Sequence, residues 1–219
     1  MQRKKLRILV ADDHPVVRRG LCLLIEREED MMVCAEAEDT KEVLRAAVEH
    51  KPDLALLDIS LKNSNGLELL KDMRRRVPEI PVLMLSVHDE NVYAERAVQA
   101  GARGYVMKQE ATERVLDAIR RVARGELYLS ENVQSRLLRI SGGLKNEETT
   151  PVTRLSNREL EVFEMVGRGK GRQEIAKALG ISIRTAEAHF ARIKEKLGLK
   201  SQTELLQQAT LWLLGENGG

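Results

Sequence analysis

Five short apolar runs, each about as long as a β-strand, alternate with helical patterns over the first half of the chain. The run in PDLALLDIS (52–60) is apolar from Leu54 to Leu57 and ends abruptly in Asp58. A continuous apolar run of this length is typical of a strand that helices cover on both faces. The other runs are, in chain order, 6–11, 32–37, 81–86 and 103–107. The alternation predicts an α/β doubly wound, five-stranded parallel sheet with right-handed crossovers.

Charged or hydroxyl side chains follow four of these runs. They are Asp12 and Asp13, Asp58, Ser86 and Lys108. Because the carboxyl ends of parallel strands meet at one edge of a sheet, we expect these side chains to lie together. Clustered carboxylates repel one another and favour a cation, and an oxygen-rich site suits Mg²⁺. Ser86 and Lys108 could contact phosphoryl oxygens, and Asp58 could accept a phosphoryl group as a nucleophile.

Residues 6 to about 124 resemble the receiver domain of two-component response regulators, which has a flavodoxin-like fold. The motifs that carry the resemblance are ADDH, LLDIS, LSVHDE and GYVMK. The resemblance implies that Asp58 is the phosphoacceptor. It also implies that Asp13, Asp58 and the backbone carbonyl of Ser60 ligate Mg²⁺, with Asp12 helping through bound water.

The same resemblance gives roles to the polar residues of the later strands. Ser86 and Lys108 are expected to contact the phosphoryl group, and Tyr105 to be the aromatic side chain whose rotation reports it. One departure from the family pattern is Leu61-Lys62, where Met-Pro is usual after the phosphoacceptor. Losing proline frees the loop backbone, so the rigidity of the loop and the lifetime of the phosphoryl group are open at this point.

Composition limits the cellular setting. No apolar stretch approaches the roughly 18 residues that cross a bilayer, and the short apolar run at the start is followed at once by acidic residues. Cys22 and Cys34 lie in apolar patterns without metal-ligand spacing, which favours two buried, reduced thiols. We therefore expect a cytoplasmic protein without a membrane segment.

The second half of the chain begins after a stretch with the composition of a linker. A short helical pattern over Ser130–Ile140 is followed by SGGLKNEETTPVT, which is rich in glycine and polar residues. We expect a receiver domain at 1–124, a linker at 125–153 and a second domain at 154–219. From Val152 onward there are 11 Lys and Arg against 8 Asp and Glu, a weak basic bias in the direction of nucleic-acid binding.

Four helical patterns follow the linker and predict a small all-α domain. Ser156 with Glu159, and Ser201 with Glu204, have the spacing of capping boxes that begin helices. Two shorter patterns joined by a turn at Gly180 describe a helix-turn-helix, whose second helix would enter the major groove. By spacing alone, a small helical bundle without a DNA-binding role fits equally well.

Residues 155 to 214 resemble the LuxR-type helix-turn-helix domain found in the NarL/FixJ class of response regulators. The shared features are the glycines, EIA, TxxxH, IxxKL and a closing helix. On this resemblance the candidate DNA contacts are Arg172, Arg184, Thr185, Glu187, His189, Arg192, Lys194, Lys196, Lys200 and Ser201. At 186–187 the chain has Ala-Glu where the family often has Val-Lys. Glu187 either accepts from a cytosine amino group or is simply solvated.

Together the two resemblances imply a transcription factor switched by phosphorylation rather than an enzyme. A sensor histidine kinase would phosphorylate Asp58, and the phosphorylated protein would pair as a homodimer on double-stranded DNA. Catalysis would be limited to self-phosphorylation from small phosphodonors and self-dephosphorylation. The alternative is a DNA-binding regulator whose receiver is only a protein-interaction module. A phosphohydrolase or NTPase is less favoured, because no GxxxxGK loop is present.

Overall fold

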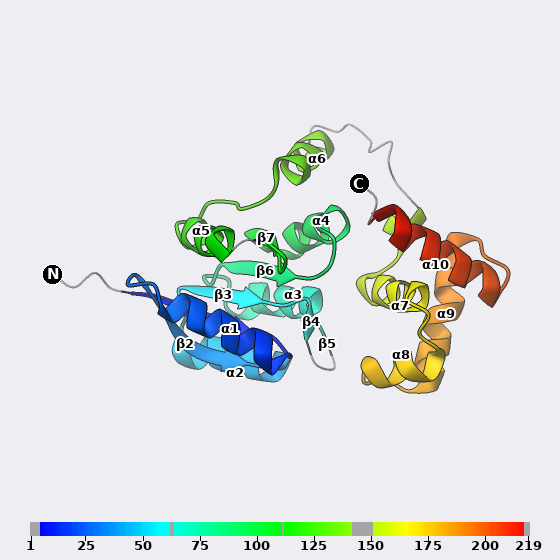
Figure 1. The fold of residues 1–219 in the computed structure, drawn as a ribbon, viewed down its shortest axis with the longest axis horizontal. Coiled ribbons are helices and arrows are strands. Elements are labelled where there is room, and N and C mark those ends of the chain that lie inside the picture. The colour runs from blue at the N-terminus through cyan, green and yellow to red at the C-terminus, as the bar shows by residue number, and fades with distance from the viewer. Residues whose placement is uncertain (1–4, 62–63, 111, 142–150, 217–219) are drawn as a thin grey trace. The chain divides into compact units, whose positions relative to one another are not determined.

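The computed structural model describes residues 5–61, 64–110, 112–141 and 151–216 and divides into two compact units (Figure 1). The first unit spans Met1–Leu144 and the second Lys145–Gly219. The division falls inside the segment 125–153. Lys62, the residue in place of the usual proline, lies outside the described residues. In the described ranges, no helix is long and apolar enough to cross a membrane.

The first unit is a parallel sheet with helices on both faces. Its elements are β1 (Leu6–Ala11), α1 (Pro15–Glu26), β2 (Met31–Ala37), α2 (Thr40–His50), β3 (Leu54–Leu57), β4 (Ser60–Leu61), β5 (Ser64–Asn65), α3 (Gly66–Arg76), β6 (Val82–Ser86), α4 (Glu90–Ala100), β7 (Gly104–Met107), α5 (Thr112–Ala123) and α6 (Glu131–Ser141). The five longer strands are all parallel, in the order β2-β1-β3-β6-β7. The predicted α/β doubly wound fold is therefore confirmed.

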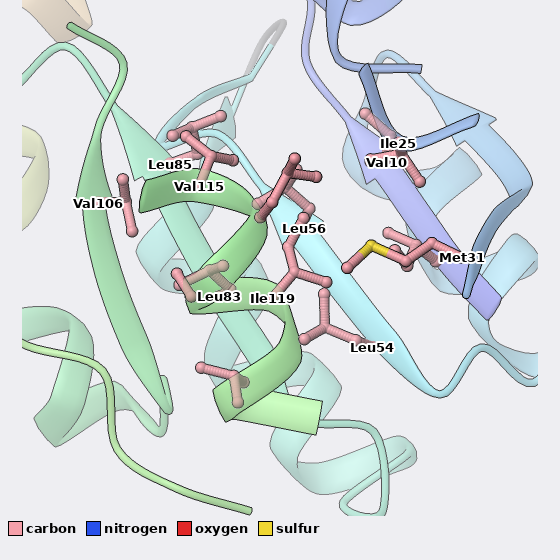
Figure 2. Close-up of a cluster of buried hydrophobic side chains, with 14 of the residues drawn as sticks. Val10, Ile25, Met31, Leu54, Leu56, Leu83, Leu85, Val106, Val115 and Ile119 are labelled. Carbon is pink, nitrogen blue, oxygen red and sulfur yellow. The ribbon is translucent and has the colours of Figure 1, made fainter. Parts of the chain in front are cut away.

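The central strands β3 and β6 bury both of their faces. On one face, α1 and α5 pack against alternate residues of the strands, and Figure 2 shows Val115 and Ile119 of α5 among Leu56 and Leu83 of the sheet. The intervening residues point to the opposite face and are equally buried, as at Leu57. The continuous apolar runs of β3 and β6 follow from this burial, because neither face of these two strands meets water. The edge strand β2 is partly exposed, as at Met32.

The strand order reverses direction at β1, which has β2 on one side and β3 on the other. In open parallel sheets, the loops at the carboxyl ends of the strands separate at such a point and leave room for a ligand. The ends of β1 and β3 are held in register there, because the Asp58 N–H donates to the carbonyl of Ala11 at 2.9 Å. Asp12, Asp13 and Asp58 therefore lie at the same edge.

The segment after α5 packs on the receiver unit, which sequence reasoning did not foresee. Tyr128 forms a parallel bridge to Gly104 of β7, with the Tyr105 N–H donating to the Tyr128 carbonyl at 3.0 Å. A Cβ on Gly104 would lie 3.0 Å from that carbonyl oxygen and 2.8 Å from Leu83 Cδ1, so this close approach needs glycine. Farther along, α6 reaches α4, where Arg136 donates to the Asn91 carbonyl at 2.7 Å.

The second unit is a small helical bundle. It contains the 3₁₀ turn η1 (Pro151–Arg154) and the helices α7 (Asn157–Gly167), α8 (Arg172–Ala178), α9 (Ile183–Leu197) and α10 (Gln202–Glu216). Helix α7 contacts both α9 and α10, and α8 contacts α9. Leu160, Phe163, Ile175, Phe190 and Ile193 are buried in this bundle. The all-α second domain is confirmed.

The caps of these helices follow the sequence signals, with one difference. Ser156 and Glu159 form the predicted capping box at the start of α7. At α10, the Ser201 hydroxyl accepts from the Glu204 N–H at 3.0 Å, as predicted. The Glu204 carboxylate, however, accepts from the Lys200 N–H at 2.8 Å, one residue earlier than a capping box requires. The box at Ser201 is therefore only half formed.

Candidate functional site

Four side chains with metal-binding atoms gather at the carboxyl edge of the sheet. They belong to Asp12, Asp13, His14 and Asp58, whose ligand atoms all lie within 4.8 Å of one another. Asp12 and Asp58 are buried, with 1% and 3% of their surface exposed, whereas His14 is exposed. The structure thus brings together the three aspartates that were predicted to cluster. It also places the imidazole of His14 beside them, which the sequence analysis did not predict.

Lys108 compensates part of this buried negative charge. Its ammonium donates to Asp12 Oδ2 at 2.6 Å and to Asp58 Oδ2 at 2.8 Å, and its side chain is 12% exposed. Burial alone would lower the pKa of Lys108, but the two carboxylates outweigh burial and hold its pKa above the ordinary value. Lys108 therefore carries its charge at neutral pH.

Asp58 has the opposite balance. Burial raises the pKa of its carboxyl above the ordinary value, and Asp12 adds to this, although Lys108 and the backbone N–H of Ser60 oppose it. The second oxygen, Oδ1, is buried and has no hydrogen-bond partner among the described residues. A buried oxygen without a partner is costly, so this oxygen is suited to accept a cation or a hydrogen-bond donor.

Ser86 and Tyr105 lie behind the acidic cluster and are connected through His88. Ser86 is fully buried, and its hydroxyl accepts from the His88 N–H at 3.2 Å. Tyr105 is also buried, and its hydroxyl donates to the His88 carbonyl at 2.8 Å. A buried tyrosine with its hydroxyl satisfied is in a defined inward position.

His88 was missed by sequence reasoning because it follows the strand end by two residues. Its Nε2 lies 3.0 Å from the Ser60 hydroxyl, in the loop after Asp58. Its ring stacks at 4.6 Å on Tyr93 of α4. One buried side chain thus joins the loop after β3 to the first turns of α4.

The loop after Asp58 also has an ordered beginning and end. Strands β4 and β5 pair Ser60 with Asn65, and the Gly66 N–H donates to the Ile59 carbonyl at 2.7 Å. A Cβ on Gly66 would lie only 2.3 Å from the Asp58 carbonyl oxygen, so glycine is required where α3 begins. The described residues before and after 62–63, from Ser60 to Leu61 and from Ser64 to Gly66, are therefore held by backbone contacts.

The candidate DNA contacts lie on α9 and at the starts of α8 and α10. Arg184, Thr185, Glu187, His189, Arg192, Lys194 and Lys196 are on α9, Arg172 begins α8, and Lys200 and Ser201 precede α10. The face of α9 that carries Ala186, Phe190 and Ile193 is buried against the bundle. The polar residues therefore occupy the remaining faces, as a recognition helix requires.

Several of these candidates make contacts within their own unit. Lys196 donates to Glu159 at 2.5 Å, and Glu187 lies 4.0 Å from the Arg172 guanidinium. The Thr185 hydroxyl lies 2.8 Å from that of Ser182. By contrast, Arg184, Arg192, Lys194 and Lys200 have no ion-pair partner within the described parts of the chain. The ion pairs of the second unit therefore leave these four cations uncompensated in the described residues.

Comparison with known families agrees with both halves of this picture. The family described as "Response regulator receiver domain" matches residues 8–120. The family "Bacterial regulatory proteins, luxR family" matches residues 153–209. This chain is a response regulator of the LuxR-type class.

Relatives cover nearly the whole response regulator. The oxygen regulatory protein NreC of Staphylococcus aureus is 36% identical over 209 residues, which is 93% of this chain and 96% of that protein. A solved structure of RcsB from Salmonella typhimurium has 26% identity and a TM-score of 0.68, covering 94% of this chain and 98% of that one. ChrA, from a heme-sensing two-component system, has 28% identity and a TM-score of 0.52, covering 96% and 98%.

One further structure shows what such a relative binds. RcsB from Salmonella enterica serovar Typhimurium has been solved on the rprA promoter with the phosphomimetic BeF3−; it has 26% identity to this chain and a TM-score of 0.63, covering 94% of this chain and 99% of that one. The expected class, receiver plus LuxR-type domain, is confirmed, and this response regulator is a transcription factor.

Proposed function

We propose that Asp58 is the phosphoacceptor of this response regulator and that its phosphorylation controls DNA binding. The observation that carries the proposal is the unpartnered Oδ1 of a buried Asp58, beside Asp12, Asp13 and Lys108. A buried, partly neutralised carboxylate can act as a nucleophile toward phosphorus, and its unpartnered Oδ1 is suited to a cation beside it.

In the proposed reaction, an Asp58 oxygen forms a bond to the phosphorus of a phosphohistidine on a sensor histidine kinase. The phosphorus–nitrogen bond breaks, and its electron pair stays with the kinase imidazole. Asp13, Asp58 and the Ser60 carbonyl would hold Mg²⁺, with Asp12 acting through water, and the bound ion would supply positive charge near the phosphoryl oxygens. The unpartnered buried Oδ1 fits this role. Acetyl phosphate would serve as a donor in the same way. Catalysis by this protein would be limited to the phosphorylation and dephosphorylation of its own Asp58.

Lys108 and Ser86 would then respond to the new charge. The Lys108 ammonium now donates to two carboxylates, and a phosphoryl group on Asp58 offers it a stronger anionic partner. The Ser86 hydroxyl can donate to another phosphoryl oxygen. Because His88 donates to Ser86 and accepts from Tyr105, a shift at Ser86 is passed to Tyr105 and to α4.

The expected partners follow from this switch. We propose a histidine kinase as donor, a homodimer as the phosphorylated form, and double-stranded DNA as the target of the second unit. Paired recognition helices would read two half-sites, with Arg184, Arg192, Lys194 and Lys200 on phosphates or base edges. A transcription factor of this class acts in the cytoplasm.

The test compares wild type with Asp58→Asn after incubation with acetyl phosphate and Mg²⁺. Phosphate-affinity gels measure phosphorylation, light scattering measures the mass in solution, and selection from random duplex oligonucleotides measures DNA binding. Asp117→Asn is the matched control, because Asp117 is an exposed acid on α5 of the same unit. We expect a phosphoprotein, a dimer and tighter DNA binding in wild type and in the control, and none of these responses in Asp58→Asn.

Two outcomes would contradict the proposal. Phosphorylation of Asp58→Asn would move the acceptor elsewhere. Equal dimerisation and DNA binding by both proteins, with or without phosphodonor, would leave the receiver as an interaction module that needs no phosphorylation.

A further inference from the structure

His14 stands where a ligand could be added to the acidic site. It is the N-cap residue of α1, with extended backbone and no side-chain capping hydrogen bond. Its backbone N–H donates to Asp12 Oδ1 at 2.8 Å, which fixes the position of its Cα beside the carboxylates. Pro15 follows at the first helical position and restricts the backbone further. The imidazole is therefore positioned by the backbone and is not used in capping the helix.

The ring nitrogen Nδ1 is turned toward the carboxylates. It lies 2.7 Å from Asp13 Oδ1 and 3.5 Å from Asp12 Oδ1. Within the described ranges, however, Asp13 Oδ1 is buried and accepts no hydrogen bond. The short distance to Nδ1 is therefore not a hydrogen bond with good geometry. Two ligands of one cation, each about 2.1 Å from the metal and at right angles, are separated by about 3 Å. The approach of Nδ1 to Asp13 has that spacing.

The buried Asp58 oxygen is an independent sign that a cation belongs here. Asp58 Oδ1 has no partner among the described residues, and the Asp58 carboxylate is in the same group of ligand atoms as a ring nitrogen of His14. The formal charges agree, since three carboxylates against the single ammonium of Lys108 leave two negative charges. One divalent ion balances them.

An ordinary ion pair between His14 and Asp13 is the competing explanation. His14 is 65% exposed and Asp13 25%, and pairs at such exposure contribute little to stability. A pair of that kind predicts no preference among divalent ions. A nitrogen ligand does, because imidazole suits Co²⁺, Ni²⁺ and Zn²⁺, whereas Mg²⁺ prefers oxygen ligands and retains several waters.

We propose that His14 Nδ1 is an additional ligand of this site and raises its affinity for nitrogen-accepting divalent ions relative to Mg²⁺. The proposal rests on the proposed function insofar as both use the carboxylate site, but it concerns metal choice and not phosphoryl transfer. A pocket of aspartates alone would select hard ions such as Mg²⁺, because all of its ligands would be oxygens. This pocket, with one imidazole, also accepts borderline ions of the Co²⁺ and Zn²⁺ kind.

The experiment uses the full unphosphorylated chain and two metals, MgCl₂ and CoCl₂. Calorimetric titration gives both affinities for wild type, His14→Gln and His50→Gln. His50, at the end of α2, is the matched control, because its side chain is outside the group of ligand atoms. Losing a direct ligand should weaken Co²⁺ binding by at least about tenfold, the lower end for loss of an outer-shell partner. Mg²⁺ affinity should change much less.

Proton NMR of the Co²⁺ form identifies the ligand itself. A paramagnetically shifted imidazole resonance is expected in wild type and His50→Gln and should be absent in His14→Gln. Equal Co²⁺ affinity for wild type and His14→Gln, or a shifted resonance that survives His14→Gln, would overturn the proposal. Failure of every variant to bind even Mg²⁺ would instead contradict the metal site of the proposed function. His14→Gln that takes phosphate normally with Mg²⁺ but has lost Co²⁺ selectivity supports both.

Discussion

Each unit of the protein places a lysine against an acid, and the two pairs differ in burial. In the receiver, Lys108 is 12% exposed and serves two carboxylates that are themselves 1% and 2% exposed. In the DNA-binding unit, Lys196 is 38% exposed and serves Glu159, which is 4% exposed. Glu159 has a second partner, because its carboxylate also accepts from the Ser156 N–H at 2.8 Å in the capping box.

The comparison separates a functional pair from a structural one. At Glu159 burial would raise the pKa, but Lys196 and Ser156 lower it below the ordinary value, so the acid is fully compensated. At Asp58 burial prevails and an oxygen stays without a partner in the described residues. Glu159 is thus satisfied by its own unit, whereas the described residues leave one oxygen of Asp58 able to accept a cation or a hydrogen-bond donor.

The largest expected difference comes from removing each lysine. Lys108→Met leaves Asp12 and Asp58 buried without a cation, which should lower the free energy of unfolding of the receiver by about 3–5 kcal/mol in EDTA. Lys196→Met leaves Glu159 with its backbone donor and should cost at most about 1 kcal/mol. Hydrogen exchange of β3 amides reports the receiver, and fluorescence of Trp212, the single tryptophan, reports the second unit.

Divalent cations should sharpen that difference. Added Mg²⁺ is expected to restore part of the stability of Lys108→Met, because it supplies the missing positive charge, and to leave Lys196→Met unchanged. Similar losses for the two variants, insensitive to Mg²⁺, would show that burial of the pair is not what distinguishes them.

Two glycines allow the same comparison for backbone packing. In Gly66→Ala the new Cβ meets the Asp58 carbonyl oxygen at 2.3 Å, and in Gly167→Ala it meets the Ala209 carbonyl oxygen at 2.6 Å. Each substitution should destabilise its unit by about 1–3 kcal/mol through overpacking. Only Gly66→Ala should also slow phosphorylation by acetyl phosphate, because the displaced atoms belong to Asp58.

Gly20→Ala is the control for this pair. Nothing lies within 4 Å of its Cβ position in α1, so replacing this helical glycine should stabilise the receiver by about 0.5–1 kcal/mol. If Gly167→Ala slowed phosphorylation as much as Gly66→Ala, the effect could not be assigned to the position of Asp58.

The smallest expected effect is a dependence of the second unit on pH. Burial lowers the pKa of His189 below its ordinary value of 6.5, and Arg158 and Arg192 lower it further, although Glu159 opposes them. The folded unit therefore binds fewer protons than the unfolded chain, so its stability is full above pH 6.5 and falls as the pH drops through the folded pKa. Urea titrations followed by Trp212 fluorescence should show this slope in wild type and a weaker one in His189→Gln. An unchanged slope in the variant would assign the pH dependence to another group.

The fold was predictable because buried strands and helices require apolar residues at regular spacing in the sequence. Runs such as Leu54–Leu57 are apolar at every position, and the polar residue that ends each run marks the edge of the sheet. The parallel order then forces Asp12 and Asp58 together whatever the loops contain. Helix caps such as Ser156 with Glu159 were equally predictable, because a capping box depends on two residues that are three apart in the sequence.

The remaining features depend on contacts between distant segments, and no pattern in the sequence indicates such contacts. His88 reaches Ser60 across 28 positions, and nothing in the pattern of either segment points to the other. The pairing of Tyr128 with β7 uses backbone groups, which every residue has, so only Gly104 hints at it. On α9, exposed charged residues recur at the same helical spacing whatever they contact. The sequence pattern therefore did not indicate that Lys196 pairs with Glu159.

The strand-like pairing of Tyr128 occupies backbone groups at an edge of the receiver sheet. Strand β7 is an edge of the sheet, and edge strands with free N–H and carbonyl groups are templates for pairing with other chains. Tyr128 satisfies the Tyr105 N–H and the Arg103 carbonyl, so the segment that leaves the receiver also closes this edge. A fragment that ends at residue 124 would leave the edge open and aggregate more readily than one that continues through α6.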